Sequence, residues 1–312
     1  MTVTGSLRIV GFLAVLAVVF AGALAVGNAA GPVSEPVADD MADHAAGEAA
    51  DGEVHASHTP ADEELPGGLM VSQDGYTLRL LTAAAEPGRD VPIRFAIEGP
   101  DGRRVTDYDV EHGKRLHLIA VRRDVTGFQH VHPTLRKDGG WVTRLDLTAG
   151  EWRLFADFNP TGGVGLTLGA DLTVSGLYRA EGPPGPVRTA SVDGYEVRLA
   201  GDLAPGSDST LTLTVSRNGR PVTDLQPYLG AYGHLVALRE GDLAYLHVHP
   251  EGAPGDGSTE PGPDVVFEAA VPSVGQYRLF LDFRHAGTVH TAEFAVAAGA
   301  GHGGGGSDDH SH

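Results

Sequence analysis

Apolar residues fall into short runs from residue 69 onward, and most of these runs end at glycine, proline or aspartate. Representative segments are YTLRL at Tyr76, VPIRFAI at Val91, RLHLIAV at Arg115 and EWRLFADF at Glu151. Strict alternation, or a short apolar run closed by turn residues, is typical of β-strands. The pattern predicts an all-β protein with about seven short strands in roughly 100 residues, as in antiparallel β-sandwiches that are immunoglobulin-like or cupredoxin-like.

The same pattern occurs twice. DGYTLRL at Asp74 matches DGYEVRL at Asp193, and GEWRLFADF at Gly150 matches GQYRLFLDF at Gly275. Between these blocks, GRRVTD matches GRPVTD, and the segment from HLIAVR to HVHP matches that from HLVALR to HVHP. The separation is a constant 117 positions. We therefore predict two duplicated β-sandwich domains, repeat 1 at 69–177 and repeat 2 at 186–298. They are joined at SGLYRAEGPPGPV, whose glycines and prolines indicate a linker.

The first 68 residues have a different character. Ile9 to Val26 contains no charged residue and follows Arg8, which predicts a cleaved signal peptide or an uncleaved membrane anchor within 1–30 and an exported body. Residues 31–68 are acidic and lack aromatic residues, so we expect a disordered linker, and we expect the same of the Gly/His-rich tail at 299–312. Both segments could bind metal ions weakly through histidine; these are His44, His55, His58, His302, His310 and His312.

The composition of the chain limits which ligands and which metal ions it can bind. The formal net charge of −19 opposes binding to nucleic acid. With no cysteine in the chain, disulfides, thiolate metal ligands and cysteine nucleophiles are excluded. Its three methionines, Met1, Met41 and Met70, lie at or before the start of repeat 1. Soft sulfur ligands are thus scarce, which favours Cu(II), with zinc as the alternative, over Cu(I).

Each repeat carries a histidine pair in a predicted strand. Residues two apart on a strand point to the same face, so both imidazoles of one HVH motif can approach one ion. The histidine of the preceding strand supplies a third ligand, because consecutive strands are usually neighbours. The aspartate of the following DF motif supplies a fourth ligand or holds a histidine tautomer. The predicted metal ligands are His117, His130, His132 and Asp157 in repeat 1, and His234, His247, His249 and Asp282 in repeat 2.

Repeat 2 also contains His285 and His290, which have no counterpart in repeat 1. We therefore expect one site per repeat and tighter binding in repeat 2. His112, in the segment EHGKR, is interpreted as a surface histidine. The competing interpretation is that the histidines of both repeats are shared packing residues that hydrogen-bond to backbone carbonyls.

LHLIAVRRDVTGFQHVHP together with EWRLFADF resembles exported actinobacterial heavy-metal or copper-binding domain proteins similar to the YtkA-like family. There is a looser similarity to periplasmic copper chaperones. The resemblance spans roughly Met70 to Ala297 and implies metal handling outside the cytoplasm, with His117, His130 and His132, and their counterparts in repeat 2, at the ligand positions. The chain has histidine where the chaperones rely on methionine, which argues against delivery of Cu(I).

Three functions compete. The first is an extracytoplasmic metal-binding protein that buffers Cu(II) or Zn(II), or delivers it to a receiving protein. The second is a cell-surface β-sandwich interaction protein that binds no metal. The third is a bicupin-like metalloenzyme, but no glutamate follows either HVH motif at the required spacing and no GxSxG motif is present. We therefore expect no catalysis.

Overall fold

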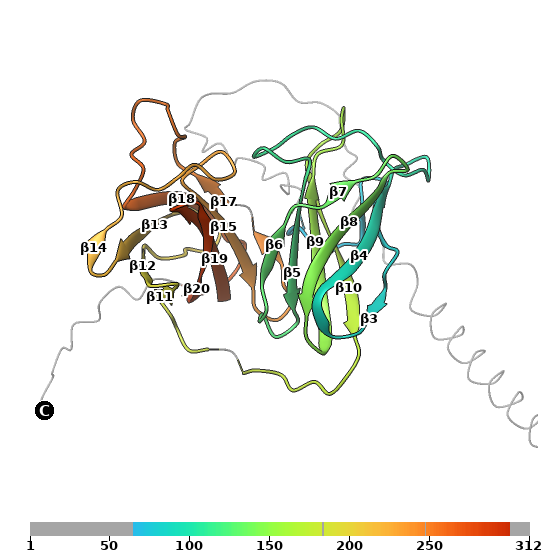
Figure 1. Ribbon diagram of the computed structural model, residues 1–312, viewed down its shortest axis with the longest axis horizontal. Helices are drawn as coiled ribbons and strands as arrows, with labels where there is room; N and C mark the ends of the chain where they lie inside the picture. Colours follow the sequence, from blue (N-terminus) through green and yellow to red (C-terminus); the bar gives the residue numbers. More distant parts are fainter. Residues whose placement is uncertain (1–64, 183, 247, 300–312) are drawn as a thin grey trace, which may run out of the picture. The chain divides into compact units, whose positions relative to one another are not determined.

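The computed structural model describes residues 65–182, 184–246 and 248–299. The predicted signal or anchor at 1–30, the tail from residue 300 and most of the acidic linker lie outside the described residues. The described residues form strands and turns without any helix, and thus include no helix able to span a bilayer. They fold as two β-sandwiches in tandem, repeat 1 in blue to green and repeat 2 in yellow to red (Figure 1). The prediction of duplicated antiparallel sandwiches is confirmed.

Repeat 1 consists of two five-stranded sheets. The first has the order β1-β2-β4-β8-β7, and the second has the order β3-β10-β9-β5-β6. All pairings are antiparallel except that of β3 with β10. The strands are β1 Ser72–Gln73, β2 Tyr76–Leu80, β3 Ala84–Ala85, β4 Gly88–Glu98, β5 Leu116–Arg122, β6 Gln129–Val131, β7 Thr134–Leu135, β8 Gly140–Leu147, β9 Gly150–Phe158 and β10 Leu166–Val174.

Repeat 2 follows the same plan. One sheet has the order β11-β12-β13-β18-β17 with β14 beside β13, and the other has the order β16-β15-β19-β20. A parallel bridge between Leu203 and Ala298 stands where β3 pairs with β10 in repeat 1. The strands are β11 Thr189–Val192, β12 Tyr195–Ala200, β13 Asp208–Arg217, β14 Arg220–Pro221, β15 Gly233–Arg239, β16 Tyr245–Leu246, β17 Val248–Pro250, β18 Asp264–Ala270, β19 Gly275–His285 and β20 Thr288–Ala298.

The strand order is that of an immunoglobulin-like sandwich. In repeat 1, β2, β4, β8 and β7 follow the order A-B-E-D in one sheet, and β5, β9 and β10 follow C-F-G in the other. Each sandwich has its own apolar core between its two sheets. In repeat 1 the core contains Phe95, Trp141 and Trp152, and in repeat 2 it contains Phe267 and Tyr277.

A third apolar cluster joins the two repeats, and we call it the inter-repeat apolar patch. It contains Ile119, Val121, Val125, Phe155, Val236, Leu238, Leu243 and Phe280, with Phe128 and Tyr245 packed against it. Phe128 stacks on Phe280 with ring centroids 4.0 Å apart, and Phe155 lies 5.8 Å from Tyr245. Phe128 and Tyr245 are equivalent positions of the two repeats, as are Phe155 and Phe280. The repeats therefore make the same aromatic contact twice, in reciprocal fashion.

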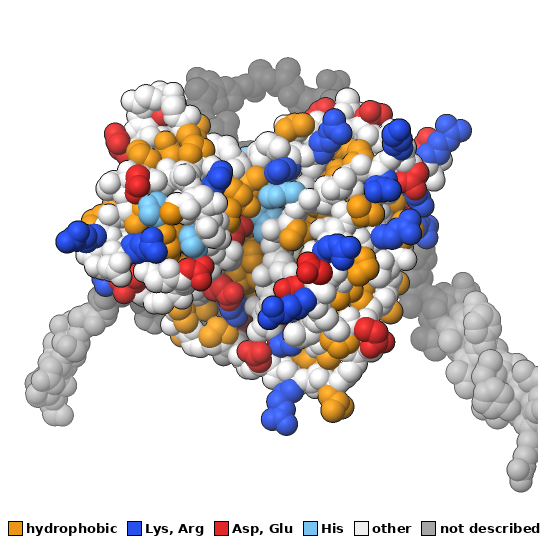
Figure 2. All heavy atoms as spheres, in the orientation of Figure 1, with side chains coloured by type: hydrophobic (Ala, Val, Ile, Leu, Met, Phe, Trp, Pro, Cys, Tyr) orange, Lys and Arg blue, Asp and Glu red, His pale blue; other side chains and the backbone are white. Residues whose placement is uncertain are grey.

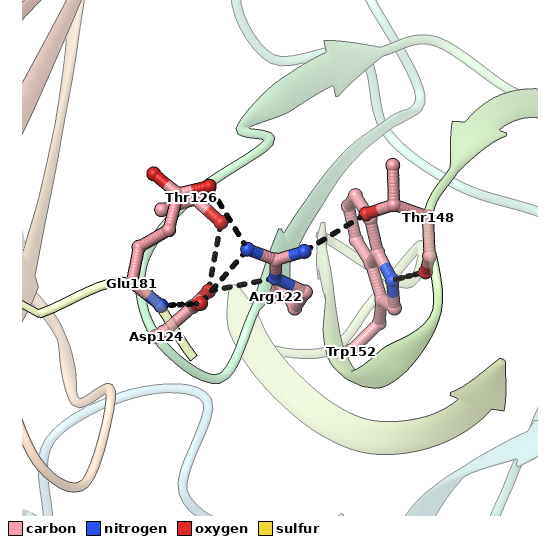
Figure 3. Close-up of polar contacts among 6 residues, drawn as sticks. All are labelled: Arg122, Asp124, Thr126, Thr148, Trp152 and Glu181. Carbon is pink, nitrogen blue, oxygen red and sulfur yellow. Dashed lines mark hydrogen bonds and ion pairs between the residues drawn. The ribbon is translucent and has the colours of Figure 1, made fainter. Parts of the chain in front are cut away.

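A nearly buried ion pair fixes the turn that leads out of β5. The Arg122 guanidinium donates to both carboxylate oxygens of Asp124, at 2.9 and 2.8 Å, and to Thr148 Oγ1 at 3.1 Å (Figure 3). The backbone N–H of Glu181 and Thr126 Oγ1 also donate to Asp124. The hydrogen bonds from Arg122, Glu181 and Thr126 together hold the pKa of the Asp124 carboxyl far below its usual range. This network anchors the segment between β5 and β6, and His130 lies in β6 directly after that segment.

Candidate metal centre

The site begins at equivalent positions of two strands, His117 in β5 and His234 in β15. In β5 the side chains of Leu116, Leu118 and Ala120 enter the core of repeat 1, so His117 and Ile119 point to the opposite face. That face is covered by repeat 2. The imidazoles of His117 and His234 stack with centroids 5.6 Å apart and an angle of 9° between ring planes. Equivalent histidines of the two repeats therefore meet each other, rather than forming one centre in each repeat.

The HVH motif of repeat 1 completes the group. β6 is antiparallel to β5 and ends at Val131, and the ring of His132, the next residue, lies 4.9 Å from that of His130. The ring of His132 is 5.0 Å from that of His117, and the ring of His130 is 4.8 Å from that of His234. His117, His130 and His234 each offer a nitrogen within 4.8 Å of the others. We call His117, His130, His132 and His234 the histidine cluster.

The hydrogen bonds of the histidine cluster leave no proton for the contact between His117 and His130. His130 Nδ1 lies 2.8 Å from Asp282 Oδ2, and His117 Nε2 lies 3.2 Å from the carbonyl oxygen of Glu111. Both partners are acceptors, so each neutral imidazole must donate its single proton outward. His117 Nδ1 and His130 Nε2 then face each other at 3.0 Å with two lone pairs. The geometry needs one more positive charge between these nitrogens, and either a proton or a metal ion can supply it.

Two further nitrogens favour a metal ion over a proton. His132 Nε2 and His234 Nε2 are buried and have no hydrogen-bond partner. An extra proton between His117 and His130 would leave both of them unpaired, at a cost of about 1–3 kcal/mol each. Burial and the neighbouring imidazoles lower the pKa of His117 to about 4 and that of His132 to about 3, and they depress the pKa of His234 as well. The neutral form, which is the one that binds metals, is therefore favoured at neutral pH.

The two DF aspartates lie where strand alternation predicts, on the face away from each sandwich core. Asp282 is directly paired with His234 in the β15–β19 register, and Asp157 is paired with His117 in the β5–β9 register. Thr291 Oγ1 donates to Asp282, which in turn accepts from His130 and orients that ring. Asp157 accepts from Thr167 Oγ1, and burial raises its pKa to about 6.

The described residues do not bring the predicted ligands of repeat 2 together in one group, and one site per repeat with tighter binding in repeat 2 stays a prediction. After β16 the chain of repeat 2 crosses to the other sheet, where β17 pairs with β18 and His249 is opposite Glu268. His247 lies outside the described residues. His285 hydrogen-bonds to Tyr195 and Asp224, and His290 to Asp193, at 2.7–3.0 Å. These residues lie near the hairpin of β19 and β20, and neither belongs to the group that offers nitrogens to one ion. Figure 2 likewise shows histidine side chains in separate places on the drawn face.

Sequence reasoning overlooked His112, which we interpreted as a surface histidine. Its side chain is exposed, but its ring lies 6.2 Å from the ring of His117 and 6.0 Å from that of His234. A signal was present in the sequence, because His112 is only five residues before the predicted ligand His117. The sequence did not indicate that His234 of the other repeat would also lie close to His112.

These features define a tandem immunoglobulin-like β-sandwich protein with a histidine cluster between its domains. A family model described as a domain of unknown function, DUF8832, matches residues 71–176 and again residues 190–300. The chain belongs to this family and contains two copies of its domain. No curated protein matches the chain.

Several solved structures are similar to parts of the chain. One is the Escherichia coli adhesin FdeC, with 16% identity and a TM-score of 0.25 over 73% of this chain and 65% of that one. Another is the Yersinia pseudotuberculosis adhesin InvE, with 12% identity and a TM-score of 0.21 over 73% and 60%. A third is the Ig1-2 module of the Drosophila receptor tyrosine phosphatase DLAR, with 10% identity and a TM-score of 0.19 over 72% and 97%. The chain thus spans less than two thirds of the two adhesin structures.

Proposed function

We propose that this protein binds a divalent transition-metal ion, most favourably Cu(II) and alternatively Zn(II), at the histidine cluster between its two repeats. The observation that carries the proposal is the contact of His117 Nδ1 with His130 Nε2, which has two lone pairs and no proton when both rings are neutral. The Nε2 atoms of His132 and His234 are buried and have no hydrogen-bond partner. A bound ion would be a Lewis acid shared by the imidazoles of His117, His130 and His234, whose nitrogens all lie within 4.8 Å of one another.

One contact of the cluster, between His117 and His130, matches the spacing of neighbouring ligands around a tetragonal ion. With metal–nitrogen bonds of about 2.0–2.1 Å, neighbouring ligand nitrogens are about 2.9 Å apart at right angles and about 3.3 Å apart in a tetrahedron. The contact between His117 and His130 measures 3.0 Å. Imidazole ligands in a tetragonal arrangement suit Cu(II), whereas a tetrahedral set of nitrogens suits zinc.

The setting of the site indicates a role in holding or passing on the ion. The apolar run at the N-terminus indicates export and a protein secreted or tethered outside the cytoplasm, and the resemblance to YtkA-like proteins points to metal handling there. We therefore propose buffering of the ion or its delivery to a receiving protein, with no catalysis. The geometry of the site supports binding of the ion, and the export signal and the resemblance support its buffering or delivery.

The test is metal analysis of the purified full chain after exposure to Cu(II) or Zn(II) and removal of loosely bound ions. We expect about one ion per chain to be retained. The double variant His130→Ala/His234→Ala should lose this ion. The matched control is His285→Ala/His290→Ala, which removes two histidines of repeat 2 outside the histidine cluster and should retain it. Equal retention in both double variants would reject the cluster as the site, because histidines outside the cluster would then account for the metal.

The competing function is a cell-surface interaction protein that binds no metal. It is favoured by the inter-repeat apolar patch, which can hold two sandwiches together by burial alone. The two functions differ in thermal stability. A ligand that binds only the native state must raise the melting temperature, so a Tm that is unchanged in excess Cu(II) and Zn(II) would favour the interaction protein.

A further inference from the structure

His112 lies at the solvent side of the histidine cluster. It is exposed, whereas the side chain of His130 is only 1% exposed and His117 as a whole only 3%. The centroid of its ring lies 6.2 Å from that of His117, in repeat 1, and 6.0 Å from that of His234, in repeat 2. The backbone of the same turn is held at the cluster, because the carbonyl of Glu111 faces His117 Nε2 at 3.2 Å.

The turn itself does not require a histidine. His112 and Gly113 have φ angles of 48° and 76°, and Glu111 and Lys114 exchange two backbone hydrogen bonds across them. Repeat 2 contains the same turn, with Leu229 and Gly230 at φ angles of 53° and 84° between Tyr228 and Ala231. Since leucine occupies the equivalent left-handed position, the conformation does not explain why repeat 1 has an imidazole there.

We infer that His112 is the exchange ligand of the inter-repeat site, the side chain that first takes up the ion from solvent and last releases it. This inference rests on the proposed function. A buried group of ligands binds an ion only after the ion loses most of its water. An exposed imidazole beside the cluster offers a first protein ligand while water still occupies the other positions. His112 therefore governs the rates of uptake and release, while the buried histidines determine the equilibrium affinity.

The experiment is stopped-flow mixing of metal-free full chain with Cu(II), followed by release of the bound ion to a chelator. The variant His112→Leu introduces the residue that repeat 2 has at this position, so the turn is retained. The variant His112→Asn also suits a positive φ and keeps a polar side chain. We expect both to slow uptake and release by about tenfold, while the equilibrium Kd changes by less than the 10–100-fold that is typical for loss of a supporting contact. The control His249→Asn removes another exposed histidine, in β17, and should leave both rates unchanged.

The outcomes are distinguishable. Wild-type rates in both His112 variants would overturn the role of His112 and leave the metal site intact. Loss of equilibrium binding in both variants would also overturn it, since His112 would then be a permanent ligand. Slow exchange in His112→Leu alone would show that leucine blocks access, which contradicts the inference. A wild-type chain that takes up no Cu(II) would overturn the proposed function together with the inference.

Discussion

At the residue scale, the buried imidazoles make stability depend on pH. The folded-state pKa values of about 4 for His117 and about 3 for His132 lie below the usual 6.5, so the unfolded chain binds these protons more tightly. The free energy of unfolding should therefore fall as pH drops below 6.5, by about 1.5 kcal/mol for His117 alone between pH 6.5 and 5. The contribution of Asp157 to the free energy of unfolding changes with pH in the opposite direction. Its pKa of about 6 exceeds the usual 3.8, so Asp157 adds stability at low pH that is lost as pH rises through 6.

The histidines outnumber the aspartate, so we expect the metal-free protein to have a lower Tm at pH 5 than at pH 7. Thermal melting in the presence of a chelator measures this. The variant His132→Leu removes one of the depressed groups and should show a smaller decrease over the same range. A Tm that rises towards pH 5, or an equal decrease in wild type and variant, would contradict this interpretation of the buried histidines.

Single residues were predicted from sequence where strand spacing alone decides their position. The pairing of His130 with His132 follows from the period of two, and the direction of Asp157 follows from its alternation with Leu154 and Phe158. The partners across the repeats could not be predicted in this way. The hydrogen bond of His130 to Asp282 joins residues 152 positions apart, and no local pattern encodes it.

At the scale of elements, the turn after β5 depends on the Arg122 network (Figure 3). The side chains of Arg122 and Asp124 are 10% and 6% exposed, so Arg122→Ala would leave a nearly buried carboxylate without its partner. We expect a loss of about 3–5 kcal/mol of stability, which chemical denaturation would measure. The control Arg198→Ala breaks an exposed ion pair with Glu196, whose side chains are 71% and 44% exposed, and should cost less than about 1 kcal/mol. Equal effects of the two changes would contradict this account.

The strands of the interface carried a signal that sequence analysis did not use. All seven residues of β5 are buried, because one face enters the core of repeat 1 and the other meets repeat 2. A run such as LHLIAVR, apolar at successive positions, is typical of a strand covered on both faces. The matching HLVALR of repeat 2 has the same character. Together these runs indicate that the repeats cover each other. The crossing of the chain from β16 to β17, which separates His249 from the histidine cluster, has no comparable signal.

At the scale of the whole molecule, duplication explains why histidines of both repeats gather in one cluster. Each sandwich presents the outer face of its β5 or β15 sheet, with an apolar patch and a histidine at the same position. When two such faces meet, His117 and His234 come together and the aromatic contacts form reciprocally. The histidines of repeat 1 are thereby joined by one histidine of repeat 2.

A metal ion at this position should couple the unfolding of the two repeats. His117 and His130 belong to repeat 1 and His234 to repeat 2, so unfolding of either repeat destroys the proposed ligand set. Free Cu(II) at a hundred times its Kd would stabilise the native state by about 2.7 kcal/mol. Removal of an interface side chain by Phe280→Ala should cost about 3–5 kcal/mol and weaken the contact that joins the repeats without metal.

Scanning calorimetry of the full chain distinguishes the contributions of the patch and the ion. In a chelator we expect Phe280→Ala to split one transition into two, because each sandwich retains its own core. With Cu(II) the transitions should merge again at a higher temperature, and the added change His234→Ala should abolish this merging. Two transitions that stay separate in Cu(II), or that merge without His234, would mean that the ion does not bridge the repeats. Each repeat would then contribute independently to whatever the protein binds.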